Sequence, residues 1–375
     1  MIQNYYNPTK ILTGSSLEIL EKILSDYRDK KILALYSHGF SNRNKDIANL
    51  FENNKNIVIY NKIQYNPGVE YIFEIIKDLE SMDFEYIIAI GGGSVLDTAK
   101  AISAIKNILI NNRGDLRRII LEEGYNCNNN FIPIIAIPTT SGTGSEVTSW
   151  STIWDFEEKK KYSISSINLY PKMAIIDPEL TSHLPQKLTA ITGLDALSHA
   201  IESYWARSTN DISRLFAIQS IETIVNTLPN LIKNLDNLEL RKQMALGSLY
   251  AGLAFSNTRT TACHSISYPL TIMYNIPHGV AVSMTLGKIL EINKENIVGV
   301  DELFKAFSKG NVNDIDDFIK NIFKISNVNY KLGDYGVKKD DIPRIVSGSF
   351  TKGRMDNNPV PITKKQLEDI LINLL

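Results

Sequence analysis

The stretch Tyr86-Ile-Ile-Ala-Ile90-Gly91-Gly92-Gly93-Ser94-Val95-Leu-Asp97 passes through three kinds of local sequence. An apolar run predicts a buried strand, three glycines and a serine predict a tight turn, and the residues from Val95 onward predict a helix. Bare backbone N–H groups beside a helix N-terminus suit a diphosphate. A turn that needs glycine only for its backbone angles explains the stretch equally well, and the GxGxxG pattern is absent from it. The stretch alone therefore predicts a strand, a turn and a helix, and leaves the phosphate site open.

A second glycine-rich segment, Ile135-Ala-Ile-Pro138-Thr139-Thr140-Ser141-Gly142-Thr143-Gly144-Ser145, also follows an apolar run. Its hydroxyls and bare backbone suit the ribose and phosphate groups of a nucleotide. A solvated loop with a helix-capping Ser or Thr is the alternative. Two such loops on one sheet favour a nucleotide site over coincidence.

Short aliphatic runs alternate with amphipathic segments through the first half of the chain, as they do in βαβ units around a parallel sheet. Strands are predicted at residues 32–36, 57–60, 86–90, 132–137 and 173–176, and helices at 16–27 and 69–81. From Lys187 onward helical periodicity predominates, and helices are predicted at 190–206, 211–228, 238–255, 286–292 and 364–374. The predicted class is α/β plus all-α. A Rossmann-like, doubly wound dinucleotide-binding domain spans residues 1–182, and an all-helical metal-binding and substrate domain spans 183–375.

Composition and charge narrow the class of protein. The 375 residues are more than one compact core usually holds, which favours two domains. Lys and Arg number 40 against 41 Asp and Glu, and this net charge of -1 offers no basic field to nucleic acid or an anionic membrane. Two cysteines are too few for a disulfide framework, and the N-terminus has no apolar run typical of a secretory signal. We expect a cytoplasmic protein with a small-molecule partner.

Four residues of the second half have the chemistry of metal ligands. Asp195 and His199 are four positions apart, so a helix places them on one face, and their apolar neighbours favour burial. A surface Asp/His pair is the alternative, but a buried carboxylate requires a compensating charge. His264 and His278 also lie among small and apolar residues, where a single histidine is more often part of the core. The four together offer one oxygen and three nitrogens, a set suited to Fe²⁺ or Zn²⁺ with a position left for substrate. Cys263 adjoins His264, so its side chain is expected to point away from the site.

These motifs are similar to those of the iron-containing (group III) alcohol dehydrogenase family over nearly the whole chain. The resemblance is carried by Asn7-Pro-Thr, Gly91-Gly-Gly-Ser94, Pro138-Thr-Thr-Ser-Gly-Thr-Gly-Ser-Glu146, Asp177-Pro178, Gly193-Leu-Asp195-Ala-Leu-Ser-His199, Pro277-His278-Gly279 and Asn358-Pro359. It implies a dinucleotide-binding domain and a helical domain, often in a homodimer. It also implies that the metal, Fe²⁺ or Zn²⁺, is bound by Asp195, His199, His264 and His278. The NAD(P)H contacts that it implies are Asn66, Gly92, Gly93, Ser94, Asp97, Thr139, Thr140, Thr143, Ser145 and Lys161.

The implied chemistry is reversible hydride transfer between C4 of the nicotinamide and the carbonyl carbon of an aldehyde held on the metal. A divalent cation stabilises the negative charge that develops on the oxygen. Tyr268, four residues beyond His264, stands where many members have a histidine with a proton-relay role. A phenol with a pKa of about 10 donates a proton but is a poor base at neutral pH.

A second departure concerns the choice of nucleotide. Many members have an Asp at the end of the first nucleotide-domain strand, where its charge binds the adenosine ribose and repels a 2′-phosphate. This sequence has Ser37 instead, with Arg43 or Lys45 nearby to supply a positive charge. We therefore expect NADPH to be accepted.

The substrate is expected to be anionic. Arg259 lies within one or two helical turns of His264, and the C-terminal stretch around Lys352 and Arg354 adds two more cations. A guanidinium group forms a planar fork for phosphate-like or carboxylate oxygens. The alternatives are an ion pair for Arg259 and solvated loop charges for the other two. The run Ser256–Leu270 resembles the phosphonoacetaldehyde reductase branch, which makes 2-hydroxyethylphosphonate.

Three other functions stay open at this point. One is a general short-chain aldehyde reductase, or a semialdehyde reductase, of the same family. Another is the dehydroquinate synthase branch, although its Glu-His-His metal set disagrees with an Asp and three histidines. The third is a regulator with a degenerate nucleotide and metal site, which the intact glycine loops and the four ligands disfavour.

Overall fold

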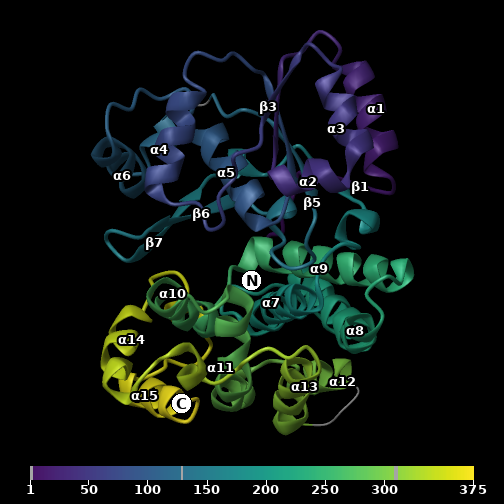
Figure 1. The fold of residues 1–375 in the computed structure, drawn as a ribbon. Helices are drawn as coiled ribbons and strands as arrows, with labels where there is room; N and C mark the ends of the chain where they lie inside the picture. The colour runs from purple at the N-terminus through teal and green to yellow at the C-terminus, as the bar shows by residue number, and fades with distance from the viewer. Residues whose placement is uncertain (1–2, 128–129, 308–310) are drawn as a thin grey trace. The chain divides into compact units, whose positions relative to one another are not determined.

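The computed structural model describes residues 3–127, 130–307 and 311–375, and its contacts divide the chain into two compact units. The α/β unit consists of Asn7–Thr140 and Ser145–Leu180, and the helical unit consists of Met1–Tyr6, Ser141–Gly144 and Thr181–Leu375. Figure 1 labels most of the helices and some of the strands of the two units. The segment Ser141–Gly144 lies inside the sequence range predicted for the first domain, but it packs with the helical unit.

A parallel sheet forms the centre of the α/β unit, and in the described residues its six strands have the order β1-β8-β5-β4-β2-β3. The strands are β1 (Lys10–Thr13), β2 (Ile32–Tyr36), β3 (Ile57–Tyr60), β4 (Tyr86–Gly91), β5 (Ile134–Pro138) and β8 (Met173–Ile176). The predicted strands are confirmed, with shifts of one or two residues at the ends of β4 and β5. The chain runs outward from β2 to β3 and then crosses back past β2 to β4, so the strand order reverses between β2 and β4.

Alternate residues of each strand contribute to two separate apolar cores, because successive side chains point to opposite faces of a sheet. Leu33 and Ile87 belong to the core beneath α4 (Val69–Asp78), α5 (Gly93–Ile105) and α6 (Arg113–Leu121). Ile32 and Ile88 belong to the core beneath α1 (Ser16–Asp26), α2 (His38–Arg43) and α3 (Lys45–Glu52). These two sets of helices lie on opposite sides of the sheet in Figure 1, which confirms the doubly wound architecture.

Three strands of this unit are not predicted from the sequence. β1, at the edge of the sheet, has only two apolar residues, Ile11 and Leu12, between Lys10 and Thr13, too few for a recognisable apolar run. β6 (Trp150–Asp155) and β7 (Lys160–Ser165) form an antiparallel hairpin apart from the main sheet. The hairpin is attached to α6 through Arg117, whose Nε donates to a carboxylate oxygen of Asp155 at 2.6 Å.

The helical unit has one apolar core, and no strand occurs in the part of it that is described. Its helices are α7 (Gln186–Trp205), α8 (Asp211–Lys233), α9 (Leu238–Thr258), α10 (Ala262–Tyr274), α11 (His278–Asn293), α12 (Val300–Ala306), α13 (Val312–Ile325), α14 (Ile342–Gly348) and α15 (Lys364–Ile372). The all-helical prediction is confirmed, although α10, α12, α13 and α14 were not predicted from the sequence.

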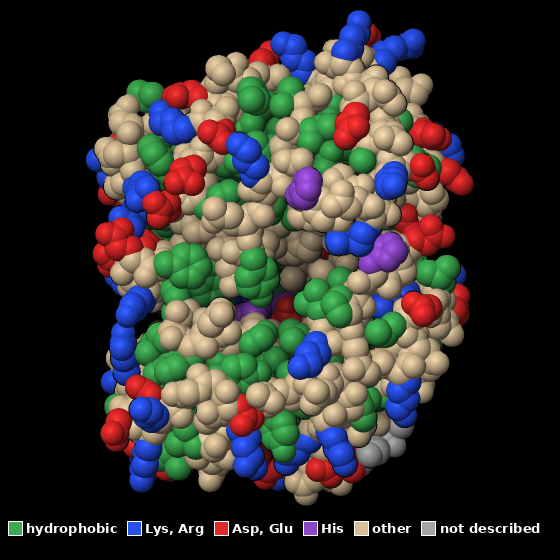
Figure 2. Space-filling model, in the orientation of Figure 1, with side chains coloured by type: hydrophobic (Ala, Val, Ile, Leu, Met, Phe, Trp, Pro, Cys, Tyr) green, Lys and Arg blue, Asp and Glu red, His purple; other side chains and the backbone are tan. Residues whose placement is uncertain are grey.

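The surface agrees with the charge balance of the sequence. On the face that Figure 2 shows, acidic and basic side chains are interspersed and do not gather into a patch of one sign. Among the residues that the structure describes, no helix combines the length and the apolar character needed to cross a membrane.

Candidate metal centre and nucleotide-binding loops

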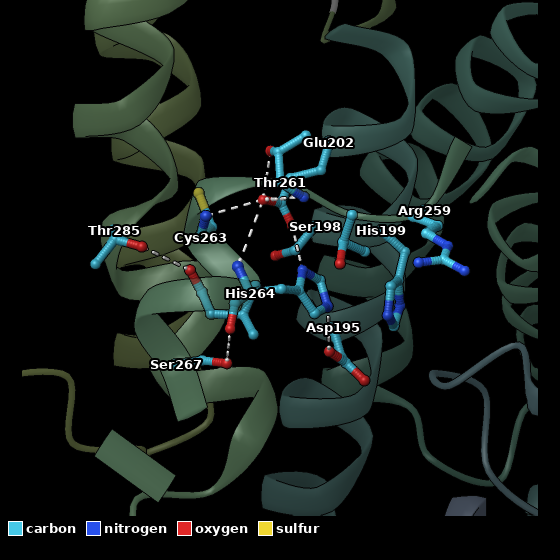
Figure 3. Close-up of polar contacts among 12 residues, drawn as sticks. Asp195, Ser198, His199, Glu202, Arg259, Thr261, Cys263, His264, Ser267 and Thr285 are labelled. Atoms are coloured by element: carbon cyan, nitrogen blue, oxygen red, sulfur yellow. Dashed lines mark hydrogen bonds and ion pairs between the residues drawn. The ribbon is translucent and has the colours of Figure 1, made fainter. Parts of the chain in front are cut away.

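The helical unit brings the four predicted metal ligands together. Figure 3 labels three of them, Asp195, His199 and His264. Asp195 and His199 lie one turn apart on α7, His264 lies in the first turn of α10, and His278 is the first residue of α11. Ligand atoms of Asp195, His199 and His264 lie within 4.8 Å of one another. Oδ1 of Asp195 is 3.8 Å from Nε2 of His264 and 3.9 Å from Nε2 of His278. These distances are too long for hydrogen bonds and leave room for an ion between the atoms.

Burial makes this cluster a poor place for an uncompensated negative charge. Asp195 is 5% exposed, and its Oδ1 has no hydrogen-bond partner within the described ranges. Burial, together with the negative charge of Glu202, raises the pKa of Asp195 well above its ordinary range, and burial lowers the pKa of His199 well below its own. A divalent cation would favour the ionised carboxylate and so offset the first effect, and it binds the neutral imidazole that the second effect favours. The residues present therefore fit Fe²⁺ or Zn²⁺.

Each histidine of the cluster has an oxygen atom at Nδ1. His199 faces the carbonyl oxygen of Gly142 at 3.3 Å, and His278 faces Oγ of Ser267 at 3.4 Å. His264 faces a carboxylate oxygen of Glu202, a residue that the sequence analysis does not identify. An Nδ1–H that donates to oxygen leaves the lone pair on Nε2, which is the tautomer that binds a metal. Glu202 could have been found from its spacing, because it follows Asp195 by seven positions on the same helix face.

Cys263 and Tyr268 flank His264 on α10. Burial raises the pKa of the Cys263 thiol well above its ordinary value, so the thiolate form that binds metals is disfavoured. Tyr268 is 6% exposed, and its ring lies parallel to that of His278 with 6.3 Å between the centroids. The fold thus places the phenol, which stands at the family's proton-relay position, beside a candidate ligand.

Arg259 ends α9 with a backbone conformation that residues other than glycine rarely adopt. Its φ of 60° and ψ of -175° lie in a region that is almost exclusively populated by glycine. The N–H of Arg259 donates to the carbonyl oxygen of Phe255 at 2.8 Å, and the ring of Phe255 stacks on that of His199 with 4.1 Å between centroids. Arg259 therefore stands one helical turn from a side chain that covers a candidate ligand, and Figure 3 draws it on the His199 side of the cluster.

The loop after α14 runs alongside Arg259. A Cβ atom added to Gly353 would lie 3.4 Å from Nη1 of Arg259. Arg354 follows, is 9% exposed, and donates from Nη1 to the carbonyl oxygen of Gly353 at 2.9 Å. The structure thus brings Arg259 and Arg354 onto neighbouring loops, while the Lys352 side chain is exposed.

In the α/β unit the predicted cofactor residues gather where the parallel strands end. Ser37, Gly92 and Thr139 follow β2, β4 and β5, which are neighbours in the sheet. The strand order reverses between the first two, and such a reversal is where ligands bind open α/β sheets. Gly92 is the N-cap of α5 and provides no side-chain cap, so the first N–H groups of this helix can meet a diphosphate. A Cβ atom at Gly92 would come within 3.2 Å of the Thr140 side chain, so a larger residue would crowd this turn.

Several other predicted cofactor residues contact one another. The N–H of Asn66 donates to Oγ of Ser94 at 3.1 Å, and Oγ of Ser145 donates to a carboxylate oxygen of Asp97 at 3.0 Å. Lys161, on β7, is close enough to Asp97 to stabilise the ionised form of its carboxylate. Thr143, by contrast, lies on the segment that packs with the helical unit.

The glycines of the second loop have a structural reason that the sequence does not reveal. A Cβ atom at Gly142 would lie 2.8 Å from Cβ of Thr192 on α7, and one at Gly144 would lie 2.6 Å from Cα of Gly252 on α9. Gly144 also has a φ of 58°. Close helix packing therefore requires both glycines, whether or not a nucleotide approaches them.

Lys100 is a buried residue of the nucleotide region that sequence reasoning misses. It is 1% exposed, and its Nζ donates to Oγ of Ser145 (2.9 Å), Oγ1 of Thr148 (3.1 Å) and the carbonyl oxygen of Trp150 (2.9 Å). Burial lowers its pKa to about 8, against the opposing effect of the Asp97 and Glu146 charges. From the sequence, a lysine within a helical pattern is expected to be exposed. The burial of Lys100 is therefore seen only in the structure.

Replacing Lys100 by methionine should raise the KM for the nicotinamide nucleotide about tenfold and leave kcat nearly unchanged, because charged hydrogen bonds that hold Ser145 are lost. In the wild type, the KM should rise between pH 7 and 9 as the ammonium group deprotonates, and in Lys100→Met it should stay flat. Steady-state kinetics with varied nucleotide check both points. Lys106→Met, at the end of the same helix, is the matched control, and an equal change in KM for this control would contradict the role of Lys100.

Comparisons with known proteins agree over both units. Residues 8–178 match the family described as iron-containing alcohol dehydrogenase, and residues 189–375 match the C-terminal part of the Fe-containing alcohol dehydrogenase family. The NAD-dependent methanol dehydrogenase of Bacillus methanolicus is 32% identical over 353 residues, which cover 91% of this chain and 90% of that protein. The sulfoacetaldehyde reductase of Bilophila wadsworthia is 30% identical over 326 residues, or 84% and 82% of the two chains. The crystal structure of sulfoacetaldehyde reductase from Bifidobacterium kashiwanohense, in complex with NAD+, has a TM-score of 0.88 at 29% identity and covers 100% of this chain and 99% of that one.

Proposed function

This chain belongs to the iron-containing alcohol dehydrogenase family, and on that premise we propose that it reduces a short-chain anionic aldehyde, with phosphonoacetaldehyde as the best candidate. The product would be 2-hydroxyethylphosphonate, and a nicotinamide nucleotide would donate the hydride. The observation that carries the proposal is Arg259, an arginine held in a glycine-type backbone conformation one turn from the side chain that covers His199.

Different residues of the chain have different roles in the proposed reaction. Asp195, His199, His264 and His278 would hold Fe²⁺ or Zn²⁺, which would supply positive charge to stabilise negative charge on the aldehyde oxygen. The loops after β4 and β5 hold the diphosphate and ribose of the nucleotide. The hydroxyl of Tyr268, beside His278, donates the proton that completes the alcohol.

An anionic group fits the cationic loops of the helical unit. Arg259 and Arg354 supply two guanidinium groups from neighbouring loops, and each can bind two oxygens of a phosphonate at once. Two of the similar proteins are sulfoacetaldehyde reductases. The sulfonate group of their substrate is similar in shape to a phosphonate and has a smaller negative charge. A second arginine favours the doubly charged phosphonate.

A substrate panel tests this function. The enzyme, reconstituted with Fe²⁺ or Zn²⁺, is given phosphonoacetaldehyde, sulfoacetaldehyde, succinic semialdehyde or propanal, and oxidation of NADH or NADPH is followed by absorbance. We expect kcat/KM for phosphonoacetaldehyde to exceed that for propanal by about 10²-fold, the effect of roughly 3 kcal/mol of charged hydrogen bonding. Equal values for these two aldehydes would indicate a general aldehyde reductase. Nucleotide binding without turnover of any aldehyde would indicate a regulator.

We also propose that NADPH is accepted as a reductant. Ser37, the residue after β2, has no carboxylate, and the Arg43 guanidinium folds back over the start of α2, since a Cβ atom on Gly39 would lie 3.1 Å from its Nη1. Introducing a negative charge with Ser37→Asp should lower kcat/KM for NADPH about tenfold or more and spare NADH, because the carboxylate repels a 2′-phosphate. Kinetics with both nucleotides check this, and a wild type that strongly prefers NADH would contradict the proposal.

A further inference from the structure

Glu202 is a fully buried carboxylate that the proposed reaction leaves without a role. It is 0% exposed and lies on the face of α7 that also carries Asp195 and His199. Both of its oxygens have partners outside that helix. Oε1 accepts hydrogen bonds from the N–H of Thr261 at 3.1 Å, the hydroxyl of Thr261 at 2.6 Å and the N–H of Cys263 at 2.9 Å, and Oε2 contacts Nδ1 of His264. With both oxygens engaged, Glu202 is not an additional metal ligand.

The first role of Glu202 is to cap α10 from a different helix. Thr261 is the N-cap of α10, but its side chain makes no cap hydrogen bond. The hydroxyl of Thr261 donates to Glu202 and accepts from Nε1 of Trp205 at 2.8 Å. The first N–H groups of a helix need acceptors, and a negative charge is favoured there. Glu202 meets both needs and so fixes where α10 begins.

The second role is to set the state of His264. A carboxylate can only accept a hydrogen bond, so Nδ1 of His264 must carry the proton. The lone pair is then on Nε2, which faces Oδ1 of Asp195 at 3.8 Å. His199 and His278 have neutral oxygen partners at Nδ1, a carbonyl and a hydroxyl. Among the three histidines, His264 is thus the one whose Nδ1 contacts a charged group.

We propose that Glu202 is a positioning residue for the metal centre: it holds His264 in the metal-binding tautomer and places a second negative charge beside the cation. This proposal rests on the ligand set given under the proposed function. Two buried carboxylates, Asp195 and Glu202, match the charge of one divalent ion. Partners of this kind typically change metal affinity by about 10- to 100-fold.

Measuring the affinity of the protein for metal distinguishes the positioning role of Glu202 from a role in helix capping alone. We would measure the Zn²⁺ dissociation constant of the apo-protein by competition with a chromophoric chelator, and the unfolding temperature without metal. In Glu202→Gln, one oxygen and an NH₂ group replace two oxygens, so either the α10 cap or the Nδ1 contact is lost. The expected result is Zn²⁺ binding about 10- to 100-fold weaker than in the wild type.

Asp177→Asn is the matched control for a buried capping carboxylate. Oδ2 of Asp177 accepts from the N–H and the hydroxyl of Ser16 at 2.7 and 2.6 Å, at the start of α1 in the α/β unit. This variant should unfold at a lower temperature and keep the wild-type affinity for Zn²⁺. Glu202→Gln should show both losses.

The outcomes distinguish the two proposals. If Glu202→Gln loses stability but binds Zn²⁺ within threefold of the wild type, Glu202 is a cap only and the positioning role is overturned. If the wild type itself binds Zn²⁺ no better than Asp195→Asn, the ligand set fails and this inference fails with it. Where Glu202→Gln does not fold, Glu202→Asp replaces it, because its shorter carboxylate reaches only one of the two partners. At least fivefold weaker Zn²⁺ binding by Glu202→Asp supports the role, and unchanged binding overturns it.

Discussion

Replacing Asp195 by asparagine is expected to lower kcat/KM of the metal-reconstituted enzyme about 10³-fold, because losing the charged ligand removes roughly 4 kcal/mol of stabilisation of the developing negative charge. Asp195 is the anionic member of the candidate ligand set, and its Oδ1 lies within 4 Å of two imidazole nitrogens. An amide oxygen is neutral and a weaker ligand for Fe²⁺ or Zn²⁺. Metal content after dialysis and initial rates with phosphonoacetaldehyde measure the two losses.

The stability of Asp195→Asn should change in opposite directions with and without metal. Burial raises the pKa of Asp195, whereas in the unfolded chain the carboxyl ionises above a pKa of about 3.9. The metal-free wild type therefore loses stability as the pH rises above that value, and the neutral amide does not. At pH 7 the metal-free variant should unfold at the higher temperature. With excess Zn²⁺ the wild type should unfold at the higher temperature, because binding stabilises it by about 4 kcal/mol at 1,000 times the dissociation constant. Full metal content and activity in the variant would show that Asp195 is not a ligand.

The metal site could be predicted well from the sequence, because the regular geometry of a helix places two of its residues on one face. Asp195 and His199 are one turn apart, and the apolar residues around them predict their burial. The same geometry extends to Glu202, but its function depends on where α10 begins. That start is set by contacts between helices, such as the one from Thr261 to Glu202, which no local pattern encodes.

Some features of the nucleotide region could be predicted from the sequence, and others could not. Parallel strands with long apolar runs are recognisable, so the ends of β2, β4 and β5 could be predicted. The β6–β7 hairpin could not, because its strands mix polar and aromatic residues, yet its register places Lys161 opposite Trp154 and within electrostatic reach of Asp97. Backbone dihedral angles also could not be predicted from the sequence, and the conformation of Arg259 is the clearest example.

Replacing Arg259 by glycine should raise the unfolding temperature while it lowers kcat/KM for phosphonoacetaldehyde about 10²-fold. The backbone of Arg259 lies at φ 60° and ψ -175°, where a residue other than glycine costs of order 1–3 kcal/mol. Glycine removes that strain together with the guanidinium group. The loss of two charged hydrogen bonds to the substrate, roughly 3 kcal/mol, accounts for the fall in kcat/KM. Calorimetry and steady-state kinetics measure the two effects on the same preparation.

Propanal is the internal control for Arg259, since it has no anionic group for a guanidinium to bind. Its kcat/KM should change less than about threefold in Arg259→Gly, because scaffold and metal site are unaltered. Arg259→Ala should show the same substrate selectivity without the gain in stability, as alanine keeps the backbone strain. Arg259→Lys should recover only part of the activity, because an ammonium group cannot reproduce the two-pronged contact. Equal losses for propanal and phosphonoacetaldehyde would mean that Arg259 shapes the end of α9 and does not bind the substrate.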